Sequence, residues 1–187
     1  VWALQAAFDS ELIQNLQGSG SSLSRLPTAG QLPRDEWAQL HHSNVIETVG
    51  EKVQLTADFH RALEFESLLR TKIRFVQEVF PDPNSSTWDP NDIESAGRSR
   101  ARLLELFDYS RALDDSEDNR QHVARWMGIT TELTRHEAGV CLDNFDFASF
   151  SNAIDIGGNS GEMARQICSR HKHIEITVLD LPLVCQA

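Results

Sequence analysis

The fold of this chain is decided by the stretch Ala153-Ile154-Asp155-Ile156-Gly157-Gly158-Asn159-Ser160-Gly161, continued by Thr177-Val178-Leu179-Asp180-Leu181-Pro182. A short apolar run ends in an acid and glycines, and the residues that follow have the apolar spacing of a helix. A second apolar run then ends in another acid. The pattern predicts a strand over 153–156, a glycine-rich turn, a helix, and a strand over 174–179, which together open a βαβ unit.

The turn between the first strand and the helix favours a ligand related to nucleotides. Because glycine has no Cβ, the backbone can approach a ligand closely, and the first N–H groups of the following helix lack internal partners. A dinucleotide fingerprint would need glycine at 157, 159 and 162, but the chain has Asn159 and Glu162. Asp180, at the end of the second strand, can accept both hydrogen bonds of a ribose diol.

Composition narrows the partners of the chain. Its 187 residues are 40% hydrophobic, carry a formal charge of −11, and have a sequence pI of about 5.0. This acidity repels a phosphate backbone, so we expect no nucleic-acid partner. The absence of a long apolar run predicts no membrane span. The start of the chain, Val1-Trp2-Ala3-Leu4, suggests a trimmed chain without a signal peptide, and a cytoplasmic location is the default expectation.

The cysteines and the paired histidines lack the spacing of a metal site. Cys141, Cys168 and Cys185 contain no C-x-x-C pair, and we expect buried or partly buried thiols without chemistry. His41 and His42 have no further ligand at the spacing that zinc sites use. We therefore predict no metal.

Helical spacing dominates the first half of the chain. It predicts an amphipathic helix over 1–17, a polar loop over 18–33, a helix from Pro33 through Val49 that stops at Gly50, and a short strand through Val53 and Leu55. A strong apolar stripe predicts one helix over 56–80. Helices followed by a small β element are typical of a winged helix, but the acidity of the chain disfavours DNA binding.

Two further helices lead to the glycine turn. Asp-Pro after the loop over 82–92, which holds Trp88, predicts a helix over 91–109. Three arginines on it lie near Glu94 and Glu105 and predict a salt-bridged solvent face rather than an anion site: Arg98, Arg100 and Arg102. The acidic residues 114–118 begin a long helix over 117–142. Three aromatic residues then connect it to the first strand: Phe145, Phe147 and Phe150.

Asp155, Gly157 and Gly161 resemble the D-x-G-x-G-x-G turn of S-adenosylmethionine-dependent methyltransferases, with Asn159 in place of the middle glycine. Asparagine tolerates the left-handed backbone that such a turn needs. Most of residues 35–187 resemble the N-terminal part of the small-molecule O-methyltransferases of plants and of bacterial natural-product pathways. The resemblance is carried by Asp180-Leu181-Pro182 with Val184, by residues 107–118 followed by Met127, and by the winged-helix start.

The resemblance implies a fold and a site. The expected fold is a mainly helical, winged-helix-like dimerisation and lid region over 1–142, then the start of an α/β Rossmann-like methyltransferase domain over 143–187, truncated after its second strand. The expected partners are S-adenosylmethionine, a small-molecule substrate and a second copy of the chain in a homodimer. The resemblance places cofactor contacts on Asp155, Gly157, Gly158, Asn159, Gly161, Asp180, Leu181 and Thr131, and substrate contacts on Val123 and Met127. Val123, Met127 and Thr131 can equally form an ordinary helix face.

The resemblance also implies missing parts. Such enzymes need an acid after the third strand for the adenine and a later histidine that takes the substrate proton, so we expect the catalytic residues outside this sequence. The chain would then be a fragment, a chain completed by another polypeptide, or a degenerate copy. Three alternatives to methylation of a small-molecule hydroxyl remain: a C-methyltransferase domain of a polyketide assembly line, a non-catalytic dimerisation or interaction module with a vestigial turn, and a winged-helix regulator.

Overall fold

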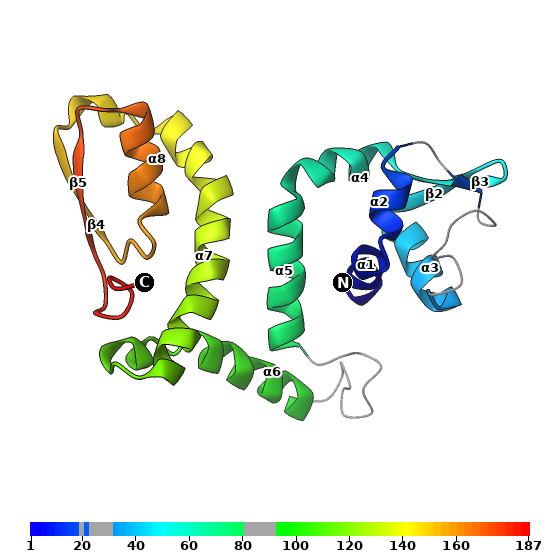
Figure 1. Cartoon of the computed structure of the whole chain (residues 1–187), viewed down its shortest axis with the longest axis horizontal. Helices are drawn as coiled ribbons and strands as arrows, with labels where there is room; N and C mark the ends of the chain where they lie inside the picture. Colours follow the sequence, from blue (N-terminus) through cyan, green and yellow to red (C-terminus); the bar gives the residue numbers. More distant parts are fainter. Residues whose placement is uncertain (19–20, 23–31, 81–92) are drawn as a thin grey trace. The chain divides into compact units, whose positions relative to one another are not determined.

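A computed structural model describes residues 1–18, 21–22, 32–80 and 93–187 (Figure 1). The chain divides into two compact units, Val1–Glu78 and Val79–Ala187. The predicted loop over 82–92 with Trp88, and most of the loop over 18–33, lie outside the described residues. None of the described helices combines the length and the apolar character that crossing a bilayer requires.

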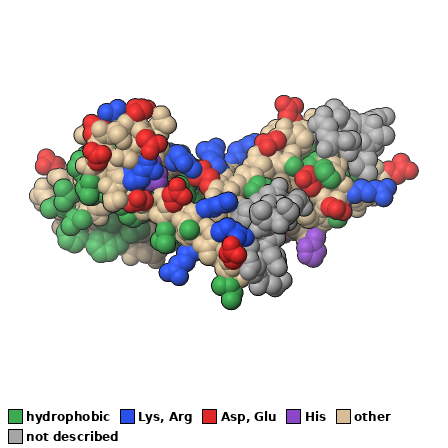
Figure 2. All heavy atoms as spheres, turned by 90° about the horizontal axis from the view of Figure 1, so that it is seen from below, with side chains coloured by type: hydrophobic (Ala, Val, Ile, Leu, Met, Phe, Trp, Pro, Cys, Tyr) green, Lys and Arg blue, Asp and Glu red, His purple; other side chains and the backbone are tan. Residues whose placement is uncertain are grey.

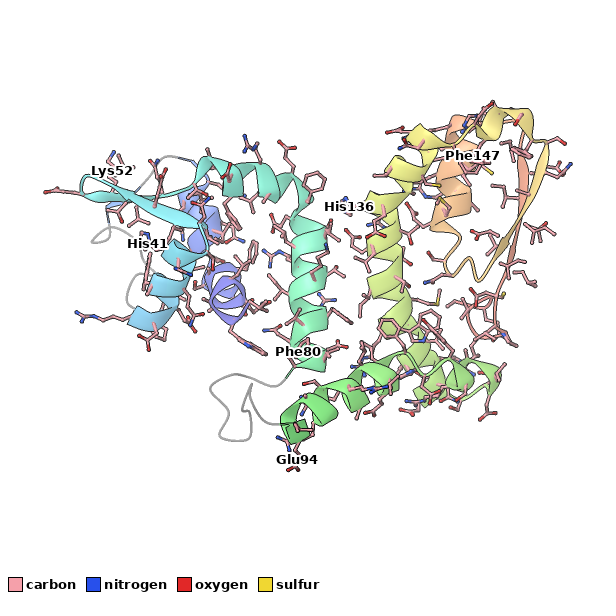
Figure 3. The ribbon with its side chains drawn as sticks, turned by 180° about the vertical axis from the view of Figure 1, so that it is seen from behind. His41, Lys52, Phe80, Glu94, His136 and Phe147 are labelled. Atoms are coloured by element: carbon pink, nitrogen blue, oxygen red, sulfur yellow. The ribbon has the colours of Figure 1, made fainter. Side chains whose placement is uncertain are left out.

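The first unit contains helices around a small antiparallel sheet. Its elements are α1 (Trp2–Asp9), α2 (Leu12–Leu16), β1 (Ser21–Ser22), α3 (Arg34–His42), β2 (Ile46–Val49), β3 (Lys52–Leu55), α4 (Ala57–Ala62), η2 (Leu63–Phe65) and most of α5 (Glu66–Val79). The sheet order is β1-β3-β2, and Ile46 pairs with Leu55 across the hairpin. Three helices followed by a hairpin confirm the predicted winged-helix-like arrangement. Figure 3 labels His41 on α3 and Lys52 at the start of β3.

The predicted single helix over 1–17 is wrong, because the chain breaks between α1 and α2. Glu11 takes a left-handed conformation with φ 59°, which no α-helix accommodates. The polar run Asp9-Ser10-Glu11 lies at the break. The change of direction lets Leu12, like Phe8, enter one hydrophobic core, which side-chain periodicity alone does not indicate.

The predicted helix from Pro33 to Val49 is also wrong in its second half. The helix α3 ends at His42, Asn44 turns with φ 57°, and the next residues form the strand β2. β-branched side chains such as Ile46 and Val49 favour a strand over a helix. Gly50, with φ +62°, lies in the hairpin turn between β2 and β3 and does not end a helix.

The predicted helix over 56–80 is interrupted once. Thr56 caps α4 by accepting the N–H of Phe59 at 3.1 Å, and the 3-10 turn η2 separates α4 from α5. Ile73 on α5 belongs to the same core as the first helices. The guanidinium of Arg70 lies 4.1 Å from the centre of the Phe8 ring, which adds a cation–π contact between α5 and α1.

The second unit contains the predicted βαβ opening. Its elements are α6 (Ile93–Leu106), η3 (Tyr109–Leu113), α7 (Glu117–Asn144), η4 (Phe147–Ser149), β4 (Asn152–Ile156), α8 (Glu162–Arg170) and β5 (Glu175–Leu179). The strands β4 and β5 are parallel, with Ile154 opposite Thr177 and Ile156 opposite Leu179. This register confirms the predicted strand, turn, helix and second strand. The long helix predicted over 117–142 is α7, and the helix predicted over 91–109 ends earlier, at Leu106.

The helix α7 packs against α8 beside the two strands (Figure 1). Ala138 and Leu142 of α7 share a core with Ile167 of α8 and with Ile174. Phe147, labelled in Figure 3, packs on this core. The ring of Phe145 lies 4.6 Å from that of Phe147 and 5.9 Å from that of Phe150, as the predicted aromatic connection requires.

Candidate cofactor site

The glycine turn after β4 uses three left-handed residues in alternation. Gly157 has φ 71°, Asn159 has φ 54°, and Gly161 has φ 72°. Such φ values cost little for glycine and are tolerated by asparagine. The turn is closed by hydrogen bonds from the N–H of Gly157 to the carbonyl of Leu179 and from the N–H of Gly161 to the carbonyl of Gly158, both of 2.8 Å. These bonds fix the turn at the ends of both strands.

At Gly158 there is no room for a side chain. A Cβ built on this residue would lie 2.7 Å from Cγ of Asp155 and 2.8 Å from Cγ1 of Val178. Side chains do not approach that closely, so a larger residue would have to displace Asp155 or Val178. The glycine therefore allows the acid of β4 to lie against the turn.

Asp180 connects the end of β5 to the turn. One carboxylate oxygen accepts the N–H of Asn159 at 2.7 Å, and the other accepts the N–H of Leu181 at 2.7 Å. Because a carboxylate has about four lone-pair positions, both oxygens keep acceptor capacity for a diol. The two bonds hold the carboxylate of Asp180 in one orientation beside the turn.

A hollow of about 650 Å³ opens beside the turn. It is lined by the turn, by α7, by η3 and by the residues after β5: Tyr109, Trp126, Thr130, Thr134, Asp155, Gly157, Gly158, Asn159, Met163, Asp180 and Leu181. The ring of Tyr109 meets that of Trp126 edge-on at 5.1 Å, which gives the hollow an aromatic wall. Among the described lining residues the charged side chains are Asp155 and Asp180, so the hollow favours a cationic guest.

Three buried polar atoms of this lining lack hydrogen-bond partners within the described part of the chain. They are Nε1 of Trp126, Oδ2 of Asp155 and Oδ1 of Asn159. Buried polar atoms are usually paired, and an unpaired one is costly. One donor and two acceptors around a hollow of this size fit a polar ligand of nucleoside size that carries a positive charge.

The structure gathers most of the predicted site residues in this hollow. Asp155, Gly157, Gly158, Asn159, Asp180 and Leu181 all line it. Gly161 and Met127 instead line a neighbouring hollow of about 360 Å³. Val123 is only 1% exposed and lies in the interior, and Thr131 donates a hydrogen bond to Ser160 Oγ at 2.7 Å. The cofactor and substrate roles predicted for these residues stay predictions.

Sequence reasoning did not identify the α7 residues that line the hollow, which are Trp126, Thr130 and Thr134. They follow one another at four-residue spacing and so share one helix face. The predicted face through Val123, Met127 and Thr131 has the same spacing, and both faces contain apolar residues. Only the position of α7 beside the turn distinguishes them. Tyr109 and Met163 carried no signal in the sequence.

A buried acid on α8 joins it to α7 next to the site. Glu162 accepts hydrogen bonds from Arg165 at 2.7 Å and from Gln166 at 2.9 Å. The Arg165 hydrogen bond is the largest influence that lowers the pKa of Glu162 to about 2, while burial acts in the opposite direction. Gln166 also donates to the backbone carbonyl of Arg135 on α7 at 3.0 Å. The first turn of α8 is thereby held against α7.

The histidines and cysteines were predicted to bind no metal, and the cysteines to be at least partly buried. Within the described ranges, no group of three or more His, Cys, Asp or Glu side chains could hold a metal ion. The expectation of buried or partly buried thiols is wrong for Cys141 and Cys185, which are exposed, and holds for Cys168, which is partly buried. Arg98 pairs with Glu94 at 3.0 Å, as predicted for this helix.

Comparison with known proteins finds similarity to O-methyltransferases in the second half of the chain. Residues 97–187 match the family model of the O-methyltransferase domain. Sterigmatocystin 8-O-methyltransferase of Aspergillus flavus is 34% identical over 82 residues, which is 42% of this chain and 18% of that protein. The 6-hydroxytryprostatin B O-methyltransferase of Aspergillus fumigatus is 30% identical over 79 residues, 42% of this chain and 22% of that protein.

Solved structures extend the likeness of the fold to nearly the whole chain. The S-adenosylmethionine-dependent methyltransferase SibL superposes with a TM-score of 0.65 at 16% identity, over 99% of this chain and 55% of that one. The mitomycin 7-O-methyltransferase MmcR gives a TM-score of 0.57 at 19% identity, over 99% and 56%. The chain thus spans about a fifth of the two curated relatives and just over half of these two structures. Residues 97–187 therefore resemble the O-methyltransferase domain, and the chain has the fold of these two methyltransferase structures.

Proposed function

We propose that this chain forms part of a methyltransferase that uses S-adenosylmethionine to methylate a hydroxyl group of a small molecule. The observation that carries the proposal is the hollow of about 650 Å³ beside the glycine turn, in whose lining Asp180 is held by the N–H of Asn159. The match of residues 97–187 to the O-methyltransferase domain model supports the same reaction.

Five of the predicted cofactor residues have a role in this proposal. Asp180 would accept hydrogen bonds from the hydroxyl groups of the ribose, because backbone N–H groups hold both of its oxygens in place. Gly157 and Gly158 would let the backbone approach the ligand closely. Asp155 and Asn159 offer buried acceptors to a positive charge. When bound, the cofactor supplies an electrophilic methyl group, and the chain contributes mainly by orienting the reactants.

The substrate would lie on the α7 side of the hollow. Tyr109 and Trp126 present ring surface there, and the buried indole N–H of Trp126 can donate to an oxygen of the substrate. Met127 and Val123, which the resemblance assigns to the substrate, lie on a different face of α7. We assign no catalytic base within the described residues.

The assembly and the location of the protein belong to the same proposal. We expect a cytoplasmic homodimer in which the winged-helix-like elements α3, β2 and β3 contribute to the contact between two copies. Light scattering coupled to size-exclusion chromatography tests this part, since a dimer has twice the 21.0 kDa mass of the chain. A monomer at all concentrations would contradict it.

Calorimetric titration with S-adenosylhomocysteine tests the proposed cofactor site. We expect saturable binding that Asp180→Ala weakens by at least about tenfold, since a hydrogen bond to a charged group contributes about 1.5–3 kcal/mol. Asp143→Ala is the matched control, because Asp143 is an exposed acid of the same unit that pairs with Arg170 outside the hollow. Equal binding by wild type and Asp180→Ala would remove the assignment of Asp180.

A non-catalytic interaction module is the second candidate, and one observation favours it. The apolar side chains on one face of the short sheet are largely exposed, with Ile154 at 68%, Ile156 at 79% and Leu179 at 55%. Figure 2 shows hydrophobic side chains gathered at the end of the view where Figure 1 places β4 and β5. Exposed apolar patches of this kind mark contact surfaces. A folded sample that binds no S-adenosylhomocysteine would favour this candidate.

A further inference from the structure

Asn159 fastens the glycine turn to the long helix α7. Its Nδ2 donates to Oγ1 of Thr130, which lies 29 residues earlier in the chain. The next residue of the turn makes a parallel contact, since Thr131 Oγ1 donates to Ser160 Oγ at 2.7 Å. A glycine at 159 would leave out the first of these bonds. The side chain at this position therefore has a contact that the glycine of the resembled D-x-G-x-G-x-G turn cannot make.

The hydroxyl of Thr130 determines which way the Asn159 amide points. A threonine hydroxyl has one hydrogen, and Thr130 donates it to the backbone carbonyl of Trp126 at 3.0 Å or of Met127 at 3.2 Å. The oxygen of Thr130 can then only accept from the amide, so Nδ2 of Asn159 faces Thr130 and Oδ1 faces away from it. This Oδ1 is buried and has no partner within the described residues.

The surroundings of this oxygen suit a cation with several hydrogens. Asn159 lines the same hollow as Asp155, whose Oδ2 is also buried without a partner there, and as Asp180. The lining within the described chain contains two carboxylates and neither lysine nor arginine. An ammonium group has three donors and one positive charge, so it would satisfy both free acceptors and offset the negative charge.

We propose that Asn159 determines the binding of the amino-acid portion of the cofactor, with Oδ1 accepting a hydrogen bond from its ammonium group. Thr130 is a positioning residue that keeps Oδ1 directed away from α7. This inference rests on the proposed function. Asn159 would then contact the ligand through its side chain, which the glycine at this position of the D-x-G-x-G-x-G turn cannot do.

Two ligands and three variants test the inference on the purified chain. S-adenosylhomocysteine carries the amino-acid portion, and 5′-methylthioadenosine lacks it. Asn159→Gly removes the acceptor at a residue with φ 54°, which glycine adopts without strain, so the variant should stay folded. We expect calorimetry to show about tenfold to a hundredfold weaker binding of S-adenosylhomocysteine and unchanged binding of 5′-methylthioadenosine.

The Thr130 variants separate orientation of the amide from general stability. Thr130→Val removes the hydroxyl while keeping the volume, and it should weaken S-adenosylhomocysteine binding by about threefold to tenfold, consistent with a neutral hydrogen bond of about 1 kcal/mol. Thr130→Ser keeps the hydroxyl and should bind as the wild type does. Thermal unfolding followed by circular dichroism confirms that all three variants are folded.

The outcomes distinguish this inference from the proposed function. If the wild type binds S-adenosylhomocysteine and Asn159→Gly binds it equally well or more tightly, the role of Asn159 is wrong and the proposed function stands. Equal weakening for both ligands would show that Asn159 only supports the turn, and it would also overturn the inference. If the folded wild type binds neither ligand, the proposed function fails and the inference fails with it.

Discussion

Gly157, Gly158 and Gly161 have different physical roles in one turn. Gly157 and Gly161 are left-handed, whereas Gly158 has no room for a Cβ between Asp155 and Val178. The sequence predicted the turn because closely spaced glycines between apolar runs have few other uses. It could not tell which glycine serves conformation and which serves space, since that depends on the side chains of two strands.

Gly158→Ala tests the close approach at the turn. The added methyl group would overlap Asp155 and Val178, so we expect the free energy of unfolding to fall by about 1–3 kcal/mol, as for other overpacked sites. Urea unfolding measures the change. Gly139→Ala is the control, because Gly139 lies within α7 with nothing within 4 Å, and alanine there should stabilise the helix by up to about 1 kcal/mol. A neutral Gly158→Ala would contradict the packing described here.

The burial of His122 predicts that the stability of the second unit depends on pH. Its side chain is buried on α7, and its Nδ1 lies 3.1 Å from Arg111. Burial is the main cause that lowers the pKa of His122 from 6.5, with Arg111 and Arg125 acting in the same direction and Asp108 and Asp118 opposing them. The folded state therefore favours neutral imidazole, and the unfolded state binds a proton first as the pH falls.

We expect the free energy of unfolding to decrease as the pH falls below about 6.5, because of this lowered pKa of His122. His122→Gln cannot titrate, so it should show a flatter dependence between pH 6.5 and pH 5. Unfolding curves in urea across this range measure the slope. The same slope for wild type and variant would show that His122 is not its source.

Among the elements, the helical spacing of apolar residues predicts most of the helices but not the points where they end. The pattern over 1–17 is apolar at helical spacing throughout, and nothing in it indicates that Glu11 turns left-handed. β2 was missed because its short apolar run follows a helix at compatible spacing. Strands this short depend on their partners, here β3, for their stability. Tertiary packing decided both cases.

Glu11→Gly tests the break between α1 and α2. Glycine adopts φ 59° without the steric cost that Glu11 bears, so the free energy of unfolding should rise by about 0.5–1 kcal/mol. Gln14→Gly, at an exposed position inside α2, is the control and should lower it by about 1 kcal/mol. If both variants are destabilised alike, residues 9–12 are helical in solution.

The contact between α7 and α8 should fail in acid. With its pKa lowered to about 2, mainly by the hydrogen bond from Arg165, Glu162 stabilises the fold fully above about pH 4.5 and loses this contribution as the pH falls toward 2. Arg165→Ala should shift acid unfolding to higher pH. Arg120→Ala, which removes an exposed pair on α7 with Asp115, should change it little. Circular dichroism during acid titration compares the two variants.

At the scale of the molecule, the order of the elements was predictable and the composition of the site was only partly so. The apolar runs predict both strands of the second unit. The acids near the ends of these strands, Asp155 and Asp180, both line the hollow. The contributions of Tyr109, Trp126 and Thr130 depend on how η3 and α7 lie beside the turn. Such long-range placement leaves no local pattern in the sequence.

The sheet of the second unit has an exposed apolar face, and the chain spans only part of the length of its structural relatives. Parallel sheets in α/β proteins are covered on both faces, yet Ile154 and Ile156 remain largely exposed here. The chain covers 55% of the SibL structure. The activity proposed for the whole protein rests on the proposed cofactor site beside the glycine turn, and ligand binding at that site is the property to measure.

The most direct measurement is an amide correlation spectrum of the isotopically labelled chain during titration with S-adenosylhomocysteine. We expect saturable shifts at the amides of Gly157, Gly158, Asn159 and Leu181, which line the hollow, and none at residues of the first unit such as His60. A folded spectrum that does not change, or changes confined to the first unit, would contradict the claim that the glycine turn after β4 binds the methyl donor.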